Sequence, residues 1–380
     1  MSKIKKDSHY YLIDGSGYIF RAYYALPPLS RKSDGLPTGA VNGFCNMLFK
    51  LLEDSKSIDN KERPTHFAVI FDSARKNFRN EIYSEYKGNR SDAPDDLIPQ
   101  FEYIRKSVLA FNLPSIELLN YEADDLIATY SDQIIADGGK VTIVSSDKDL
   151  MQLYKKNIRI YDPMKNKFIN NEDIEKKFGV TPSKVIDVQA LAGDSSDNVP
   201  GVPGIGVKTA AELINKYGTL ENLLKKAKEI KQNKRRETIL ENKDKATISK
   251  KLVTLKKDVP VKNKLDEFLL KEIDKKKLYD FLRGMEFNRL LSSVISTYGE
   301  IDFKNNFSEK NKENQTKISD KNYFLVDNEE DIKKWLDEAE ENGELAIDTE
   351  TTSVDPHQAK LVGISIYTKI GKACYIPIND

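Results

Sequence analysis

Nine acidic residues stand directly after an apolar run or inside a tight acidic cluster, and they carry the clearest chemical signal in this sequence. They are Asp14, Asp72, Glu122, Asp124, Asp125, Asp147, Asp149, Asp194 and Asp197. Gathered in one site, these carboxylates would repel one another unless cations neutralised them. Mg²⁺ and Mn²⁺ accept carboxylate and water ligands, and two such ions about 4 Å apart can generate a hydroxide and stabilise the leaving oxygen of a phosphodiester. The set therefore predicts metal-assisted hydrolysis of phosphate esters.

Each aspartate taken alone fits a helix cap or a turn better than a metal site. Two short runs are harder to explain in that way, YEADD at 121–125 and SSDKD at 145–149. Glu122 and Asp125 are three residues apart, so they would share one face of a helix. The doublets therefore favour a common site over a series of unrelated caps.

A glycine-rich segment, GDSSDNVPGVPGIGVKTAAELINKYG at 193–218, is the second signal. Gly201, Gly204 and Gly206 predict a tight turn that opens a helix, and such a turn presents backbone N–H groups to a phosphate. Lys208 adds a positive charge. The pattern indicates a helix–hairpin–helix element that follows a DNA backbone without reading bases. A purely structural turn is the alternative, but this motif is too specific for that reading to be favoured.

An alternation of strands and helices must position these residues. The expected strands are 10–14, 66–72 and 140–145, and the expected helices are 39–53, 95–111 and 122–136. Each expected strand places an aspartate at or just after its carboxyl end. The order predicts an α/β fold with a mostly parallel sheet, in which ligands bind outside those ends. The segment 73–94 is basic and aromatic with little apolar periodicity, as is typical of a long functional connection.

The composition divides the chain into four regions. Residues 1–170 contain the α/β core with an arch at 73–95, and residues 171–303 are helical and rich in lysine. Residues 304–321 are almost free of apolar side chains and predict a linker. Residues 322–380 begin a new βαβ pattern, which is too short for an independent domain, so we expect a truncated part of a longer fold.

The charge is balanced but segregated. The chain has 60 Lys and Arg against 60 Asp and Glu, whereas 225–257 has 13 Lys and Arg against 4 Asp and Glu. A basic stretch beside an acidic remainder suits a protein that binds a polyanion in one place and cations in another. A solvated helical face is the alternative, and charge alone does not decide between them.

Several classes of protein are excluded by composition. The two cysteines, Cys45 and Cys374, are far apart, and only three histidines occur, so neither a disulfide framework nor a zinc site is expected. No apolar signal segment opens the chain and no run of 18 apolar residues is present. We therefore expect a soluble protein of the reducing cytoplasm, without a membrane partner.

The motifs together resemble the 5′-nuclease (flap endonuclease) superfamily, in particular the N-terminal 5′→3′ exonuclease domains of bacterial DNA polymerases I. The resemblance covers residues 8 to about 300. The matching segments are LIDGSGYIFRAYYAL, VIFDSARKNFRNEIYSEYKGNR, YEADDLIAT, VSSDKDLMQL and GDSSDNVPGVPGIGVKTA. Every acidic position of the family pattern that can be placed is filled, so nothing in the sequence suggests an inactive relative.

The resemblance implies a role for each acidic residue. The first metal cluster would consist of Asp14, Asp72, Glu122 and Asp124, with Asp125 beside them as a ligand or as a residue that supports a ligand. The second would consist of Asp147, Asp149, Asp194 and Asp197. The expected cofactor is Mg²⁺, or Mn²⁺, in two ions.

The same resemblance implies the DNA contacts. Lys87 and Arg90 match the basic pair of a helical arch that holds the scissile phosphate, and Arg21 matches a further phosphate contact. Fixed cations of this kind would stabilise a dianionic transition state. Tyr86 is placed where the family stacks a base, although an ordinary packing aromatic is the alternative. The turn at 201–208 would bind duplex DNA together with a monovalent cation, and the basic stretch 225–257 would extend that contact.

The C-terminal segment carries a separate resemblance. ELAIDTETTSVDPHQAKLVGISI is similar to the start of a 3′→5′ proofreading exonuclease domain, an incomplete ribonuclease H-like α/β piece. Asp348 and Glu350 alternate on a strand and would point to one face. The remaining acidic residues and the tyrosine of that family's site have no counterpart in this chain, so we expect no proofreading from it, and no polymerase activity.

The resemblance implies a metal-dependent, structure-specific 5′→3′ exonuclease and flap endonuclease. It would act as a monomer on DNA with a 5′ flap, a nick or an RNA primer, in primer removal and repair, within a DNA polymerase polypeptide. One alternative is a catalytically silent module that binds flap DNA. Another is an RNA-directed nuclease, which the glycine-rich element disfavours.

Overall fold

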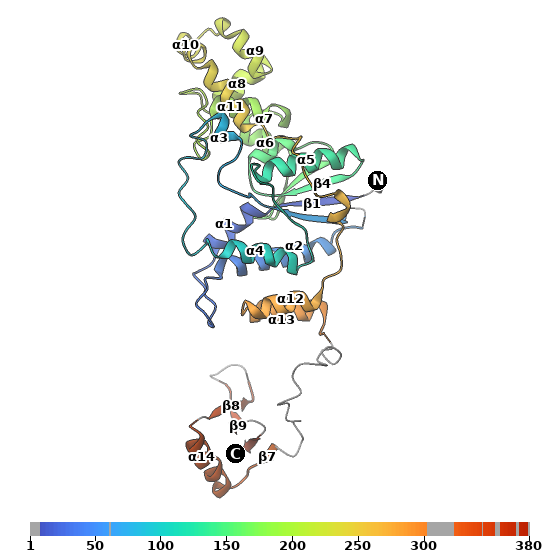
Figure 1. Ribbon diagram of the computed structural model, residues 1–380, viewed down its shortest axis with the longest axis vertical. Coiled ribbons are helices and arrows are strands. Elements are labelled where there is room, and N and C mark those ends of the chain that lie inside the picture. The colour runs from blue at the N-terminus through green and yellow to red at the C-terminus, as the bar shows by residue number, and fades with distance from the viewer. Residues whose placement is uncertain are drawn as a thin grey trace. The chain divides into compact units, whose positions relative to one another are not determined.

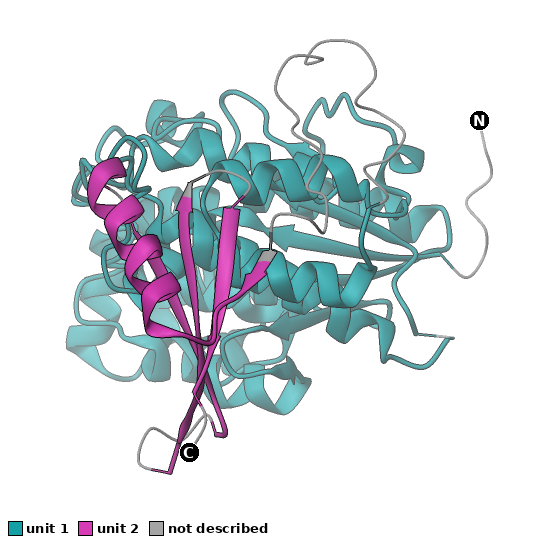
Figure 2. Ribbon diagram, turned by 90° about the horizontal axis from the view of Figure 1, so that it is seen from below, with its two compact units in different colours: residues 1–301 teal, residues 302–380 magenta. Residues whose placement is uncertain are grey.

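The computed structural model describes residues 8–60, 62–301, 323–343, 345–353, 358–369 and 372–378. The chain divides into two compact units, residues 1–301 and residues 302–380 (Figure 2). The helical region that we expected at 171–303 belongs to the same unit as the α/β core. The expected linker, 304–321, lies outside the described residues. None of the described helices is long and apolar enough to cross a membrane.

A six-stranded sheet forms the centre of the larger unit, with the order β3-β2-β1-β4-β5-β6. The strands are β1 (His9–Asp14), β2 (His66–Ile70), β3 (Ser115–Ile116), β4 (Lys140–Val144), β5 (Ile158–Asp162) and β6 (Lys167–Ile169). All neighbouring pairs are parallel except β5 and β6. The three expected strands are confirmed as β2, β1 and β4, which lie side by side. The other three are short or half-exposed and were not anticipated.

The central strand β1 shows why the sheet is covered on both faces. Every one of its residues is buried. Successive side chains of a strand point to opposite faces, so Tyr10 and Leu12 enter one hydrophobic core while Tyr11 and Ile13 enter the other. Parallel sheets normally have both faces covered by helices, and these strands accordingly have apolar side chains on both.

Two layers of helices provide that cover (Figure 1). On one face lie α1 (Gly15–Ala25), α2 (Gly39–Lys56), α4 (Gln100–Ala110), α12 (Lys275–Gly284) and α13 (Asn288–Tyr298). On the other lies α5 (Ala123–Ala136). On that side the chain continues into helices that pack mainly against one another and extend away from the sheet, α6 (Asn171–Phe178), α7 (Val185–Ala192), α8 (Val207–Tyr217), α9 (Leu220–Lys225), α10 (Asn233–Glu241) and α11 (Lys243–Val253). The hydrophobic core on this side of the sheet continues into the helical region without a break. This continuity explains why the α/β core and the helical region form one unit.

The arch segment contains little helix. Within residues 73–95 the structure has one four-residue helix, α3 (Arg79–Ile82), followed by turns. Lys87 has a φ of +54°, a left-handed conformation that ends any helical run at this point. The weak apolar periodicity of the segment is consistent with this irregular backbone.

The smaller unit is a four-stranded sheet with the order β7-β10-β9-β8 and one helix. Its elements are β7 (Tyr323–Leu325), α14 (Glu329–Asn342), β8 (Ala346–Thr351), β9 (Leu361–Lys369) and β10 (Lys372–Pro377). Its buried core is small and centres on Trp335, Ile366 and Cys374. All residues of β8 are exposed, including Asp348 and Glu350.

Candidate metal centre

The first group of carboxylates lies at the carboxyl ends of β1 and β2. Asp14 is the last residue of β1 and caps α1, and its two oxygens accept hydrogen bonds from the N–H of Gly17 (2.9 Å) and the hydroxyl of Ser145 (2.8 Å). Asp72 follows β2 and accepts from the N–H of Ala123 at 2.7 Å. The parallel register brings residues 58 positions apart in the chain to the same edge of the sheet, as the strand pattern predicted.

The N-terminus of α5 adds Glu122 and Asp124 to this edge. Glu122 is the N-cap of the helix and is buried. Asp124 has no hydrogen-bond or ion-pair partner within the described ranges. Burial and the nearby charges of Asp147, Asp14 and Asp72 raise the pKa of Asp124 well above its ordinary value. The same two effects raise the pKa of Asp14 to about 6.

The second group lies beside the first. Asp149 accepts a hydrogen bond from the amide of Gln189 at 2.5 Å, and burial together with the charge of Asp147 raises its pKa to about 7. Asp194 is ion-paired with Lys148 at 2.6 Å. Burial opposes ionisation of Asp194, but this lysine and hydrogen bonds from Ser196 together outweigh burial and lower the pKa. Asp147 acts electrostatically on both Asp124 and Asp149, so it connects the two groups.

The donor chemistry of the two groups fits divalent cations. Four carboxyl groups, those of Asp14, Asp72, Asp124 and Asp149, have raised pKa values because they are buried close to other carboxylates. The surrounding protein therefore supplies too little positive charge, and a hard divalent ion bound by oxygen ligands would supply it. In the described ranges, no three acidic, histidine or cysteine side chains are already arranged as a complete ligand set. Loading would require the side chains to adjust.

The arch cations occupy part of this space. The ammonium group of Lys87 contacts Glu122 and lies 3.5 Å from Asp197, and the guanidinium of Arg90 contacts Asp197. The backbone is fixed as well, since the N–H of Lys87 donates to the carbonyl of Asp197 at 2.9 Å. The structure thus brings the expected arch pair to the expected ligands, and these lysine and arginine side chains would have to release the carboxylates when metal binds.

Tyr86 lies inside the cluster. The residue is only 5% exposed, and its hydroxyl donates toward Glu122 at 3.2 Å and lies 3.4 Å from Asp197. Stacking on a base, the role implied by the resemblance, would require the arch to open.

Arg21 has an unused donor, because its Nη1 is buried without a hydrogen-bond partner in the part of the chain that the structure describes. An oxyanion is the natural partner for that group.

Asp125 is ion-paired with Arg79, whose Nη1 also lies 3.2 Å from Glu122. Both oxygens of Asp125 are held by Arg79 at 2.7 Å, and the side chain is fully buried. The resemblance implied two roles for Asp125 beside Asp124, a metal ligand or a residue that supports a ligand. Along a helix, however, adjacent residues point about 100° apart, so the two cannot share one ligand position. Arg79 itself was missed, since only the basic character of its segment marked it.

The glycine turn separates into two parts. Gly201 has a φ of +57°, and a Cβ there would lie 2.4 Å from the nitrogen of Gly193, so this glycine serves close backbone packing. Gly204 and Gly206 have open space where a Cβ would be, and Lys208 is exposed in the first turn of α8. The unpaired N–H groups of a helix start favour an anion. The accessible part of the predicted DNA element is therefore 204–208.

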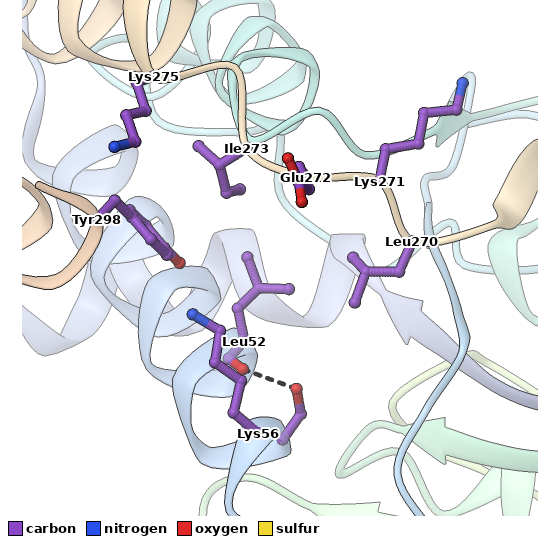
Figure 3. A pocket seen from close by; sticks show the side chains of 9 residues that line it. Leu52, Lys56, Leu270, Lys271, Glu272, Ile273, Lys275 and Tyr298 are labelled. Carbon is purple, nitrogen blue, oxygen red and sulfur yellow. Dashed lines mark hydrogen bonds between the residues drawn. The ribbon is translucent and has the colours of Figure 1, made fainter. Parts of the chain in front are cut away.

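A separate cavity of about 400 Å³ lies between α2, the segment 270–275 and α13 (Figure 3). Its charged lining groups are Lys56, Lys271, Glu272 and Lys275, around the ring of Tyr298. None of the carboxylates described above lines it. We assign this cavity no part in the chemistry of the acidic cluster.

Sequence comparison places the chain among known proteins. Residues 9–179 match the family model of the 5′-3′ exonuclease N-terminal resolvase-like domain, residues 180–276 that of the 5′-3′ exonuclease C-terminal SAM fold, and residues 323–379 that of a 3′-5′ exonuclease. A 5′-3′ exonuclease of Aquifex aeolicus is 40% identical over 75% of this chain and 94% of its own length. DNA polymerase I of Rhizobium leguminosarum is 44% identical over 99% of this chain, which spans 44% of that relative.

Solved structures share the fold. The T5 5′-exonuclease with bound zinc ions superimposes with a TM-score of 0.55 at 19% identity, covering 77% of this chain and all of that one. The catalytic core of Rad2 in complex with a DNA substrate gives a TM-score of 0.52 at 16% identity, covering 78% of this chain and 93% of that one. At such identities the likeness establishes the architecture of the larger unit.

Proposed function

This chain belongs to the 5′-3′ exonuclease family, and from that premise we propose that residues 8–301 form a divalent-metal-dependent, structure-specific 5′→3′ exonuclease and flap endonuclease. It hydrolyses phosphodiester bonds of DNA at 5′ flaps, nicks and RNA-primed ends. One observation carries the proposal. Carboxylates from the ends of three parallel strands and from the start of α5 converge on one edge of the sheet, facing the lysine and arginine of the arch.

The metal ligands of this proposal are the two carboxylate groups. They are Asp14, Asp72, Glu122 and Asp124, and Asp147, Asp149, Asp194 and Asp197. Two Mg²⁺ ions, or Mn²⁺ in their place, would supply an activated water and neutralise developing negative charge. Lys87, Arg90 and Arg21 hold the scissile phosphate and balance the charge of the transition state. No side chain becomes covalently bound to the DNA.

We propose that the helical region, residues 171–301, binds DNA away from the cleavage site. The open turn at Gly204 and Gly206, with Lys208, receives a duplex phosphate, and a monovalent cation at the turn strengthens that contact. The exposed lysines of 225–257 extend the contact along the backbone, so affinity should fall steeply with salt.

The similarity to DNA polymerases I supports a wider assignment. We propose that this chain corresponds to the N-terminal part of such a polymerase and acts in primer removal and DNA repair, as a monomer in the cytoplasm, at the nucleoid. Asp348 and Glu350 on β8 would then be two acidic residues of a 3′→5′ exonuclease site. This chain alone provides no proofreading, because two exposed carboxylates on one strand do not make a two-metal site.

Cleavage of a 5′-labelled flap duplex, with Mg²⁺ or with EDTA, tests the proposal. We expect metal-dependent release near the flap junction, and an Asp14→Ala chain that still binds the flap but cleaves it at least about 100-fold more slowly. Asp137→Ala is the matched control, because Asp137 is exposed at the opposite end of α5.

Two outcomes would favour the alternatives. A folded wild-type chain that binds flap DNA without cutting it would support a silent binding module. Faster cleavage of an all-RNA substrate than of flapped DNA would support an RNA-directed nuclease. Either result contradicts the proposal.

A further inference from the structure

We infer that Arg79 is a positioning residue that ties the base of the arch to Glu122, and that Asp125 is its counter-ion and not a metal ligand. The inference rests on the proposed nuclease function. It arises from a guanidinium that the sequence did not single out, which is 1% exposed and is among the largest fully buried side chains of the described residues.

Every N–H edge of this guanidinium is used. Nη1 and Nη2 donate to the two oxygens of Asp125, each at 2.7 Å, in the bidentate arrangement that matches the carboxylate plane. Nε donates to the carbonyl of Leu252 at 2.7 Å, and Nη2 also lies 3.3 Å from the carbonyl of Thr254. Nη1 is 3.2 Å from Glu122, a proposed metal ligand.

These contacts join three separate parts of the chain. Arg79 begins α3 at the base of the arch, Asp125 lies in the first turn of α5, and the two carbonyls belong to the end of α11 and the segment that follows it. In Figure 1 the label of α3 lies next to that of α11, and the two helices are in contact. Asp125 adds a second contact to the segment after α11, because its Oδ1 also accepts from the N–H of Lys256 at 2.8 Å.

Glu122 is held by this arrangement from two directions. One is the direct approach of the Arg79 guanidinium. The other runs through Asn77, whose side-chain oxygen accepts from the N–H of Arg79 at 2.8 Å while its amide donates to Glu122 at 3.0 Å. The base of the arch therefore sets the orientation of a carboxylate that must bind metal, and such supporting contacts are often as important as the ligand itself.

A metal at Asp125 is incompatible with these contacts. A cation bound to its carboxylate would replace the guanidinium and leave a buried positive charge without its counter-ion. The structure thus gives Asp125 and its neighbour Asp124 opposite roles. Asp124 has no hydrogen-bond or ion-pair partner within the described ranges, whereas the oxygens of Asp125 accept from Arg79 and from the N–H groups of Glu122 and Lys256.

The test compares Arg79→Lys, Asp125→Asn and the double variant with the wild-type full chain. Lysine keeps the charge but cannot make a bidentate pair, so the chain should fold while Glu122 loses its support. We expect both single variants to weaken Mn²⁺ binding, measured by electron paramagnetic resonance without DNA, and to lower kcat for flap cleavage by the same factor, about 10- to 100-fold. KM for DNA should stay unchanged, and the double variant should be no worse than either single one.

A structural readout accompanies these measurements. Limited proteolysis of the metal-free chain should cut segment 73–95 faster in both single variants than in the wild type. Lys76→Met is the matched control, because Lys76 is exposed in the same segment and should change neither readout.

The result that overturns the inference is specific. If Asp125 were a metal ligand, Asp125→Asn would weaken Mn²⁺ binding while Arg79→Lys left it unchanged, or the two losses would multiply in the double variant. Failure of the proposed function itself would look different, since the wild-type chain would then not cut the flap at all.

Discussion

At the scale of single residues, the site is determined by which cation pairs with which carboxylate. Glu122 is bound by Lys87 and approached by Arg79, Asp197 is bound by Arg90, and Asp124 is left without a partner in the described chain. Pairing lowers the cost of burying a charge, whereas an unpaired carboxylate among others holds its proton more strongly. The unpaired groups are therefore where added cations stabilise the protein most.

Histidine chemistry has a separate role, in stability. His9 is buried in β1, where its Nδ1 donates to the carbonyl of Glu62 and its Nε2 accepts from the hydroxyl of Thr142, both at 2.8 Å. Burial, with the charges of Arg159 and Lys140, lowers its pKa from 6.5 to about 4. The folded protein therefore binds this proton less readily than the unfolded chain does.

The pH dependence of unfolding follows from that shift. A depressed histidine pKa gives stability that is present above pH 6.5 and is lost as the pH falls toward 4. Between pH 7 and pH 5, His9 should remove about 2 kcal/mol from the free energy of unfolding. His9→Gln does not titrate, so the variant should lose less stability over this interval, as measured by urea unfolding at each pH. Identical pH slopes for the two proteins would contradict this role of His9.

At the scale of elements, the turn before α8 combines two functions that the sequence does not separate. Gly201 packs against the backbone of Gly193, and its N–H donates to the buried hydroxyl of Ser249 at 2.9 Å. Gly206 ends the turn as the N-cap of α8, with open space around it. The same motif thus contains one glycine required for folding and others available to a ligand.

Alanine substitutions should separate these functions. Gly201→Ala places a Cβ against backbone atoms at a positive φ, and should lower the free energy of unfolding by at least about 2 kcal/mol. Gly206→Ala has a permitted φ of −85° and should cost less than about 1 kcal/mol. Its added methyl group should instead weaken binding to duplex DNA. Urea unfolding and a fluorescence binding titration measure the two effects, and equal destabilisation by both changes would refute the distinction.

At the scale of the whole molecule, the chain contains two units whose hydrophobic cores differ greatly in size. The larger has two extensive cores on the faces of its sheet, whereas the core of the smaller contains five buried residues among those that the structure describes. Several apolar side chains of the smaller unit are exposed, including Leu325 at 70% and Ile347 at 58%. Apolar groups in such numbers on a small sheet usually belong to an interface.

Shortening the chain to residues 1–301 should therefore leave the nuclease intact. We expect flap cleavage and Mg²⁺ dependence equal to those of the full chain, because every residue proposed for flap binding and cleavage lies in the larger unit. Binding of a hydrophobic dye should decrease, since the exposed apolar residues of 323–378 are removed. A loss of cleavage in a folded 1–301 protein would show that the smaller unit contributes to the site.

The sequence by itself determined the three central strands and the class of site. Apolar runs that end in aspartate predicted β1, β2 and β4, and the parallel order required their carboxyl ends to meet at one edge. The acidic doublets predicted a metal site, because divalent metals prefer carboxylate ligands. The glycine motif predicted a tight turn before a helix, because the backbone geometry of such a turn restricts which residues can form it.

Only the tertiary structure decided which residues of the chain contact one another at the site. Arg79 meets Asp125, Lys87 meets Glu122, and Gly201 meets Gly193. The first two pairs join residues 46 and 35 positions apart. Such pairs depend on how helices and turns pack around the sheet, which no local pattern specifies. Asp124 and Asp125 are adjacent and chemically identical, yet one faces the open acidic cluster and the other a buried arginine, because a helix turns neighbouring side chains in different directions.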